Sequence, residues 1–245
     1  MTHPRTLIWA MLTLLLTIPQ VQAQWELGVG VIARDAIQKG ADSDPFVVPL
    51  ITYSGERVYF RGIEAGVRLY DTEQHSTTLF ARPRLDGFKG TDDPFLEGMA
   101  SRRNSLDAGL RHTVRVGPWQ YTALATTDVL GRNDGQTVSG TVGYVFGSMR
   151  SLLFVPYAGV EWMNADLVDY YYGVRDAEAV PGRPAYSGSD VWNLVYGARM
   201  VAPITPRVSF QGVLAGTRYG DSVADSPLTE DRHRAIAIFG VSYRF

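Results

Sequence analysis

Residues 105–116 read SLDAGLRHTVRV, and their hydrophobicity alternates with a period of two. Such alternation indicates a β-strand with one apolar and one polar face. Strands of soluble proteins usually have about 5 to 6 residues, whereas a tilted strand that crosses a membrane needs about 9 to 11. The length of this segment therefore favours a transmembrane strand. One face carries Leu106, Ala108, Leu110, His112, Val114 and Val116, and the other carries Ser105, Asp107, Gly109, Arg111, Thr113 and Arg115.

The same pattern recurs along most of the chain. In residues 58–70, Tyr59, Ile63 and Val67 share the apolar face, while Glu64 and Arg68 share the polar one. The connections between segments alternate in length: residues 117–118, 147–151 and 202–206 are short, and residues 88–103, 163–190 and 220–233 are long. Further strands are predicted at residues 25–34, 45–53, 119–129, 137–146, 152–162, 191–201, 207–218 and 234–245.

Aromatic residues mark the ends of these segments, as they do at the interfaces of membrane barrels. Open sheet edges would leave backbone N–H and C=O groups unpaired in hydrocarbon, so the sheet must close on itself. The predicted fold is all-β: a closed antiparallel transmembrane β-barrel with short periplasmic turns and long outer loops. The marker residues are Trp25, Tyr70, Trp119, Tyr144, Trp162, Trp192 and Tyr243.

The number of strands depends on the segment before residue 77. Eleven segments look like strands, counting residues 45–53 and a segment that begins at Thr77. If residues 58–70 divide near Arg61 and Gly62, the barrel has twelve strands; if residues 45–53 do not span, it has ten. A chain with both ends in the periplasm needs an even number. We predict twelve.

The first 23 residues have the order of a secretory signal peptide. His3 and Arg5 precede an apolar stretch at residues 7–18, and Val21, Gln22 and Ala23 form a small-residue cleavage site. The apolar stretch is shorter than the roughly 20 residues of a membrane-spanning helix. We expect cleavage after Ala23, which leaves residues 24–245 as the outer-membrane barrel domain.

Composition excludes several classes of function. The chain has no cysteine, so it has no disulfide, no thiolate metal site and no lipid anchor at its new N-terminus. Its net charge of −2 is unlike that of a nucleic-acid binder. No phosphate-binding loop or dinucleotide fingerprint occurs. His112 lies on an apolar strand face, and His75 and His233 lie in or beside loops. We therefore expect no catalytic residues, no cofactor and no metal.

Arginine dominates the basic residues, with only Lys39 and Lys89 as lysines. Arginine pairs with carboxylates through two parallel hydrogen bonds. Pairs of this kind across a narrow lumen would account for the bias. The candidate lumen residues are Glu64, Arg68, Arg82, Arg84, Asp86, Asp107, Arg111, Arg115 and Arg199.

Several short stretches resemble one family. They are PLITY at 49–53, GERVYFRG at 55–62, Gly98-Met99 with Arg102-Arg103, YYYGV at 170–174, Glu178-Ala179, and RPAY at 183–186. The chain is similar to the MltA-interacting protein (MipA)/OmpV family of Gram-negative outer-membrane proteins. The resemblance implies a scaffold that holds a lytic transglycosylase and a peptidoglycan synthase together. Other members are described as adhesins or porin-like proteins, and the family has no catalytic residue set.

The resulting hypothesis is a scaffold of the cell envelope without chemistry of its own. The alternatives are a narrow porin for small solutes and an adhesin. The expected partners are outer-membrane lipid, the barrel assembly machinery and a murein hydrolase and synthase. The assembly machinery would read the C-terminal strand, which ends in Tyr243 and Phe245. Murein enzymes would dock on the periplasmic rim at residues 72–76, 117–119, 147–151 and 202–207.

A long loop holds a cluster of aromatic residues, for which two interpretations are equally favoured. In the first, the residues form a patch that binds a partner. In the second, they pack the loop over the mouth of the barrel. This candidate interaction loop consists of Tyr170, Tyr171, Tyr172, Gly173 and Tyr186.

Overall fold

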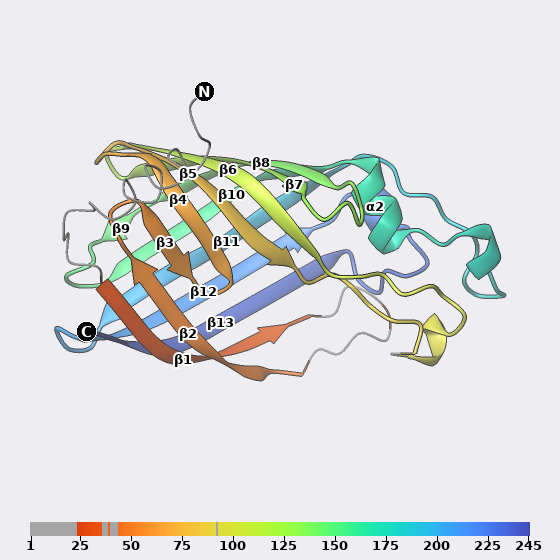
Figure 1. Ribbon diagram of the computed structural model, residues 1–245, viewed down its shortest axis with the longest axis horizontal. Coiled ribbons are helices and arrows are strands. Elements are labelled where there is room, and N and C mark those ends of the chain that lie inside the picture. The colour runs from red at the N-terminus through yellow and green to blue at the C-terminus, as the bar shows by residue number, and fades with distance from the viewer. Residues whose placement is uncertain (1–23, 36–38, 40–43, 92) are drawn as a thin grey trace, which may run out of the picture.

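The structure, a computed structural model, describes residues 24–35, 39, 44–91 and 93–245 (Figure 1). The predicted signal peptide, residues 1–23, lies outside the described residues. The strands are β1 (Gln24–Arg34), β2 (Phe46–Ser54), β3 (Val58–Arg61), β4 (Glu64–Asp71), β5 (His75–Arg84), β6 (Ser105–Val116), β7 (Trp119–Asp128), β8 (Gln136–Tyr144), β9 (Phe146–Gly147), β10 (Leu153–Met163), β11 (Val191–Pro203), β12 (Val208–Arg218) and β13 (His233–Arg244).

The strands close into a barrel. The short β9 continues β8 and pairs with the start of β10, so β8 and β9 count as one strand of the barrel wall. The described elements therefore form twelve wall strands, which we call staves. Neighbouring staves are antiparallel, and β13 pairs with β1, with Val241 opposite Val29. This closure gives every stave a paired neighbour on each side, as the hydrocarbon environment requires. The prediction of a closed, antiparallel, twelve-stranded barrel is confirmed.

The twelfth stave arises from a tight turn at Gly62 and Ile63. Gly62 has a φ of +61°, a conformation that costs little only for glycine. Across the turn, Arg61 pairs with Glu64 and Tyr59 pairs with Gly66. The expectation that Tyr59 shares the lipid-facing side with Val67 is wrong. The turn resets the alternation, so Tyr59 points inward with only 4% of its surface exposed.

The hairpin β3–β4 is shorter than its neighbours and ends about halfway along the barrel (Figure 1). Gly62 N–H donates to Ile51 O at the hairpin tip. Beyond that level, residues 46–50 of β2 pair only with β1, and residues 82–84 of β5 pair only with β6, among the described residues. The wall is therefore narrower by two strands there, and the tip of the hairpin places Arg61 beside the lumen.

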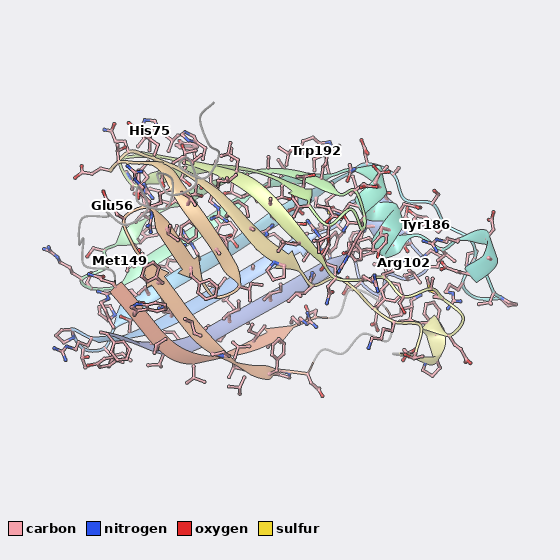
Figure 2. The ribbon with its side chains drawn as sticks, viewed as in Figure 1. Glu56, His75, Arg102, Met149, Tyr186 and Trp192 are labelled. Atoms are coloured by element: carbon pink, nitrogen blue, oxygen red, sulfur yellow. The ribbon has the colours of Figure 1, made fainter. Side chains whose placement is uncertain are left out.

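Apolar side chains cover the outside of the barrel. Val29, Leu79 and Leu214 are each half exposed or more, which suits contact with lipid tails. Trp25 stacks near Tyr53 at one end of the wall, and Trp192 is 63% exposed near the other (Figure 2). These aromatic side chains lie where the membrane interfaces would be.

The two ends of the barrel differ. One end carries the short turns and the C-terminus, and we call it the short-turn end (Figure 1). The other, the long-loop end, carries three long connections with the elements η1 (Pro94–Leu96), α2 (Ala165–Tyr172), η2 (Asp176–Glu178) and α3 (Asp221–Ala224). In the described part of the chain, none of the helices has both the length and the apolar character needed to cross a membrane.

Candidate functional site

The long connections pack against one another and form a folded loop cluster, made of residues 85–91, 93–104, 164–190 and 219–232. Its two apolar cores bury Leu167, Val168 and Val223 in one and Leu96 and Leu228 in the other, all without measurable exposure. Burial of this extent is typical of a protein core rather than of mobile surface loops. The described residues of the cluster therefore form a packed unit at the long-loop end.

A buried ion pair joins two of these connections. Arg102 Nη2 donates to Glu178 Oε2 at 2.8 Å and Nη1 donates to Oε1 at 3.1 Å, with both side chains at most 5% exposed. Backbone N–H groups of Ala100 and Arg175 also donate to the Glu178 carboxylate. Burial opposes the charged form of Glu178, but Arg102 and these donors outweigh it and hold its pKa at about 2. The pair therefore fixes residues 85–104 against residues 164–190.

Arg183 extends the same network. It is 1% exposed and donates from Nη2 to the carbonyl oxygens of Glu178 at 2.8 Å and Glu97 at 3.1 Å. It also donates from Nη1 to the carbonyl oxygen of Phe95. One guanidinium thus satisfies carbonyl groups of two connections. Stretches that carry the family resemblance, around Arg102, Glu178 and Arg183, build this cluster.

An ion-pair layer lies below the cluster, inside the barrel. Arg84 donates to both carboxylate oxygens of Asp107, at 2.7 and 3.2 Å, and lies 3.3 Å from Asp86. Asp86 also lies 3.5 Å from Arg234 of β13, on the far side of the shortened wall. The Asp107 side chain is only 3% exposed. Charges of both signs meet here in pairs, so the charges of this layer compensate one another.

Phe80 packs between Arg82, near the ion-pair layer, and Arg111. Its ring is 2% exposed, and the Arg111 guanidinium carbon lies 4.5 Å from the ring centroid. Arg82 lies over the same ring at 5.7 Å. The opposite residue is Gly109, where an added Cβ would come within 2.7 Å of the ring. The missing side chain at Gly109 makes room for the ring inside the barrel.

A cavity of about 630 Å³ occupies the short-turn half of the lumen. We call it the arginine cavity. Ser76, Arg115 and Gln120 lie on its wall within two residues of strand ends at the short turns. Its arginines are Arg61, Arg68, Arg111, Arg115 and Arg199, its carboxylates are Glu64 and Asp71, and further polar groups include Tyr59, Thr113, Thr122 and Tyr157.

The candidate lumen residues fall into these two regions. Arg84, Asp86 and Asp107 meet in the ion-pair layer, and Arg111 binds Glu64 through two hydrogen bonds of 2.8 and 2.7 Å. Arg68 lies 3.5 Å from Asp71, a carboxylate that sequence reasoning did not single out. Among the described residues, Arg82, Arg115 and Arg199 have no ion pair within 4 Å, unlike the cross-links expected for them. Alternation along a strand identifies the inward face, but it does not show which strands face each other.

The candidate interaction loop lies inside the loop cluster. Tyr171 and Tyr172 of α2 are at most 3% exposed, and the backbone N–H of Gly173 closes the helix by donating to Asp169 O. Arg102 donates to the Tyr170 carbonyl oxygen at 2.7 Å, and Tyr186 donates from its hydroxyl to Ser222 O at 2.9 Å (Figure 2). These residues pack the long connections against each other.

The last strand, β13, pairs with both β12 and β1, and Phe245 N–H donates to Trp25 O. The rings of Tyr243 and Phe245 meet edge to face with centroids 5.0 Å apart, and Phe245 is 72% exposed. Their role as the assembly signal stays a prediction.

Comparison with known proteins identifies the family. A family model described as MltA-interacting protein MipA matches residues 27–245. The chain belongs to the MipA family. The MltA-interacting protein of Escherichia coli K12 is 28% identical to it over 234 residues, which covers 93% of each chain. Outer membrane protein Omp26La of Vibrio anguillarum is 27% identical over 226 residues, which covers 91% of this chain and 88% of that one. Among solved structures, the NanC porin has 10% identity and a TM-score of 0.44, and the match covers 89% of this chain and 98% of that one.

MipA-family relatives of this chain are named as outer membrane or interacting proteins, and not as enzymes. The closed barrel, its apolar exterior and the family all indicate an outer-membrane location. The protein is an outer-membrane β-barrel. We expect its short turns to face the periplasm and its loop cluster to lie outside.

Proposed function

We propose that this protein is a scaffold of the outer membrane that docks a murein hydrolase, together with a peptidoglycan synthase, at its periplasmic rim. The observation that carries the proposal is the dense packing of the long-loop half of the barrel. The loop cluster, the ion-pair layer and Phe80 lie in series along the barrel. A barrel packed in this way suits an interaction role better than the passage of solutes. The name of the Escherichia coli relative, MltA-interacting protein, adds support.

The periplasmic rim offers apolar side chains at the tips of two short turns. Met149 is 55% exposed between β9 and β10 (Figure 2), and Ile204 is 60% exposed between β11 and β12. Exposed apolar residues of this kind act as anchors in protein interfaces. A stable interface covers about 800 Å² on each partner, so a docked enzyme would span several turns.

A capture experiment tests the docking surface. The purified full-length barrel in detergent is immobilised and exposed to the lytic transglycosylase and the synthase of the same bacterium. The double variant Met149→Asp with Ile204→Asp is compared with the wild type. We expect capture at least about tenfold weaker, because a charged group would be buried at each anchor.

The matched control is Val180→Asp, which places the same charge on a residue that is 48% exposed in the loop cluster. It should capture both enzymes as the wild type does. Failure of the wild type to capture either enzyme would contradict the scaffold, and equal capture by the double variant would exclude this part of the rim.

The narrow porin remains a distinct function with a distinct test. It requires ion conductance of the wild-type barrel in a planar bilayer, and a change in conductance when Arg111 and Arg115 are replaced by glutamine. The scaffold proposal expects a silent bilayer. Steady conductance by the wild type would favour the porin instead.

A further inference from the structure

The arginine cavity contains more positive charge than its own carboxylates can neutralise. Five arginines and two carboxylates line it, which leaves an excess of three positive charges. Both carboxylates are already engaged: Glu64 with Arg111 at 2.7 Å and Asp71 with Arg68 at 3.5 Å. The Tyr59 hydroxyl also donates to Glu64, at 2.9 Å. No carboxylate of the cavity wall remains for the other three arginines.

Those three arginines are Arg61, Arg115 and Arg199, and they come from β3, β6 and β11. Within the described ranges, none of their guanidinium groups has an ion pair or a hydrogen bond to a protein acceptor. Arg61 has only a contact with the Tyr59 ring, at 5.7 Å from its centroid. All three side chains are exposed to the space of the lumen. Their donors are therefore available to a molecule in the cavity.

The three charges lie close enough to act on each other. The positive charges of Arg61, Arg111 and Arg115 all act on Arg199. Inside a barrel with walls of low dielectric constant, such a field is focused into the cavity and attracts anions. A guanidinium group matches carboxylate and phosphate geometry through two parallel hydrogen bonds, and it stays charged at any physiological pH. Arginine is therefore suited to hold an anion with more than one acidic group.

We propose that the arginine cavity binds a small organic anion that carries two or more carboxylate or phosphate groups. The ligand enters from the short-turn end, because Ser76, Arg115 and Gln120 place the cavity wall beside the strand ends there. The volume, about 630 Å³, lies within the range of about 300 to 1,000 Å³ that is usual for small-molecule sites. Tyr157, Gln120 and Thr122 supply neutral polar groups on the same wall for hydroxyl groups of the ligand. This site goes beyond the scaffold, whose docking residues lie on the turns.

Isothermal titration calorimetry of the detergent-solubilised full-length barrel tests the proposal. The probes are citrate and pyrophosphate, which separate carboxylate from phosphate ligands, with acetate and glucose as singly charged and neutral comparisons. We expect saturable binding of citrate or pyrophosphate that is at least about tenfold tighter than that of acetate, and none of glucose, because bidentate charge-assisted contacts add up only for a multivalent anion. The affinity should fall as the salt concentration rises.

Two variants locate the site. Arg199→Gln removes one guanidinium from the cavity and should weaken binding about tenfold or more. Arg150→Gln removes the same charge from an exposed turn at the same end of the barrel and should bind as the wild type does. Arg199→Lys keeps the charge but not the planar fork, so it should recover only part of the affinity. The difference in gel migration between unheated and heated samples verifies that each variant is folded.

Several results would overturn the proposal. One is citrate and pyrophosphate binding no tighter than acetate, which would mean that the cavity holds only exchangeable counterions. Another is unchanged affinity in a folded Arg199→Gln variant. Equal losses in Arg199→Gln and Arg150→Gln would likewise contradict it, because the effect would then reflect net charge. Each of these results leaves the docking experiment at the turns unaffected.

Discussion

The two halves of the lumen contain the same kinds of residue and use them differently. In the long-loop half, Arg84 meets both Asp86 and Asp107, and Arg234 reaches Asp86. In the short-turn half, Arg61, Arg115 and Arg199 have no carboxylate partner among the described residues. The difference indicates that arginine is paired with acids in one half of the barrel, whereas it leaves the other half positively charged and accessible.

The loop cluster reinforces this contrast. It lies at the end of the half whose charges are paired, and it contains the buried ion pair between Arg102 and Glu178. The short turns do not cover the other half in the same way, because they contribute few residues. The packed loops and the accessible arginines therefore lie at opposite ends of the same barrel.

The largest expected effect is the loss of the buried pair in the loop cluster. Arg102→Ala leaves the Glu178 carboxylate buried without its counter-charge, which typically costs about 3 to 5 kcal/mol. We expect the cluster to open locally while the barrel stays folded. Limited proteolysis of the protein in lipid vesicles measures this as cleavage within residues 85–104 and 164–190.

Arg175→Ala provides the control for this prediction. Arg175 is 63% exposed and lies 3.9 Å from the same carboxylate, so its loss should change proteolysis little. Resistance of Arg102→Ala equal to that of the wild type would show that the apolar cores alone hold the cluster.

A smaller effect is expected from acid. The pKa of Glu178 is about 2 in the folded cluster against an ordinary value of 4.5. A depressed pKa means that the stabilisation is fully present above about pH 4.5 and is lost as the pH falls toward 2, by up to about 3 kcal/mol. Proteolysis with an acid protease should therefore become faster from pH 4.5 to 2.5. In Glu178→Gln the rate should depend less on pH, and an identical pH profile in both proteins would refute this origin.

The comparison between the two halves predicts that the same substitution, Arg to Gln, changes the unfolding free energy by different amounts in the two halves. Arg84→Gln leaves Asp107, whose side chain is 3% exposed, without its partner and should lower the unfolding free energy by about 2 kcal/mol. Arg115→Gln removes a charge without a carboxylate partner and should change it by about 0.5 kcal/mol or less. Guanidinium unfolding in lipid vesicles measures both. Equal losses would remove the distinction between paired and unpaired arginines.

Much of the barrel could be predicted from the sequence. The segment at 119–129 corresponds to β7 (Trp119–Asp128), and the division near Gly62 yields the hairpin β3–β4. Both follow from local signals: alternation of side chains along a strand, and a glycine that permits a positive φ at a tight turn.

The loop cluster could not be predicted in the same way. The helix α2 (Ala165–Tyr172) is stabilised by packing on residues distant in sequence, such as Tyr219 and Val223, rather than by a long amphipathic pattern. The arrangement of charges inside the barrel was equally hidden. Sequence showed that Arg111 and Arg199 face inward, but only the closed barrel shows that Arg111 meets Glu64 and Arg199 meets no acid among the described residues.

Thiol labelling distinguishes the accessible half of the lumen from the packed half, because the chain contains no cysteine of its own. Thr122 and Thr126 lie on the same strand and the same inward face, but Thr122 lines the arginine cavity whereas Thr126 is 6% exposed and is 2.6 Å from Thr137. Thr122→Cys should react with a thiol reagent added from the periplasmic side, and an anionic methanethiosulfonate should react faster than a cationic one. Thr126→Cys should resist both reagents from either side. Rapid labelling of Thr126→Cys from the long-loop side, or faster reaction of Thr122→Cys with the cationic reagent, would contradict the account.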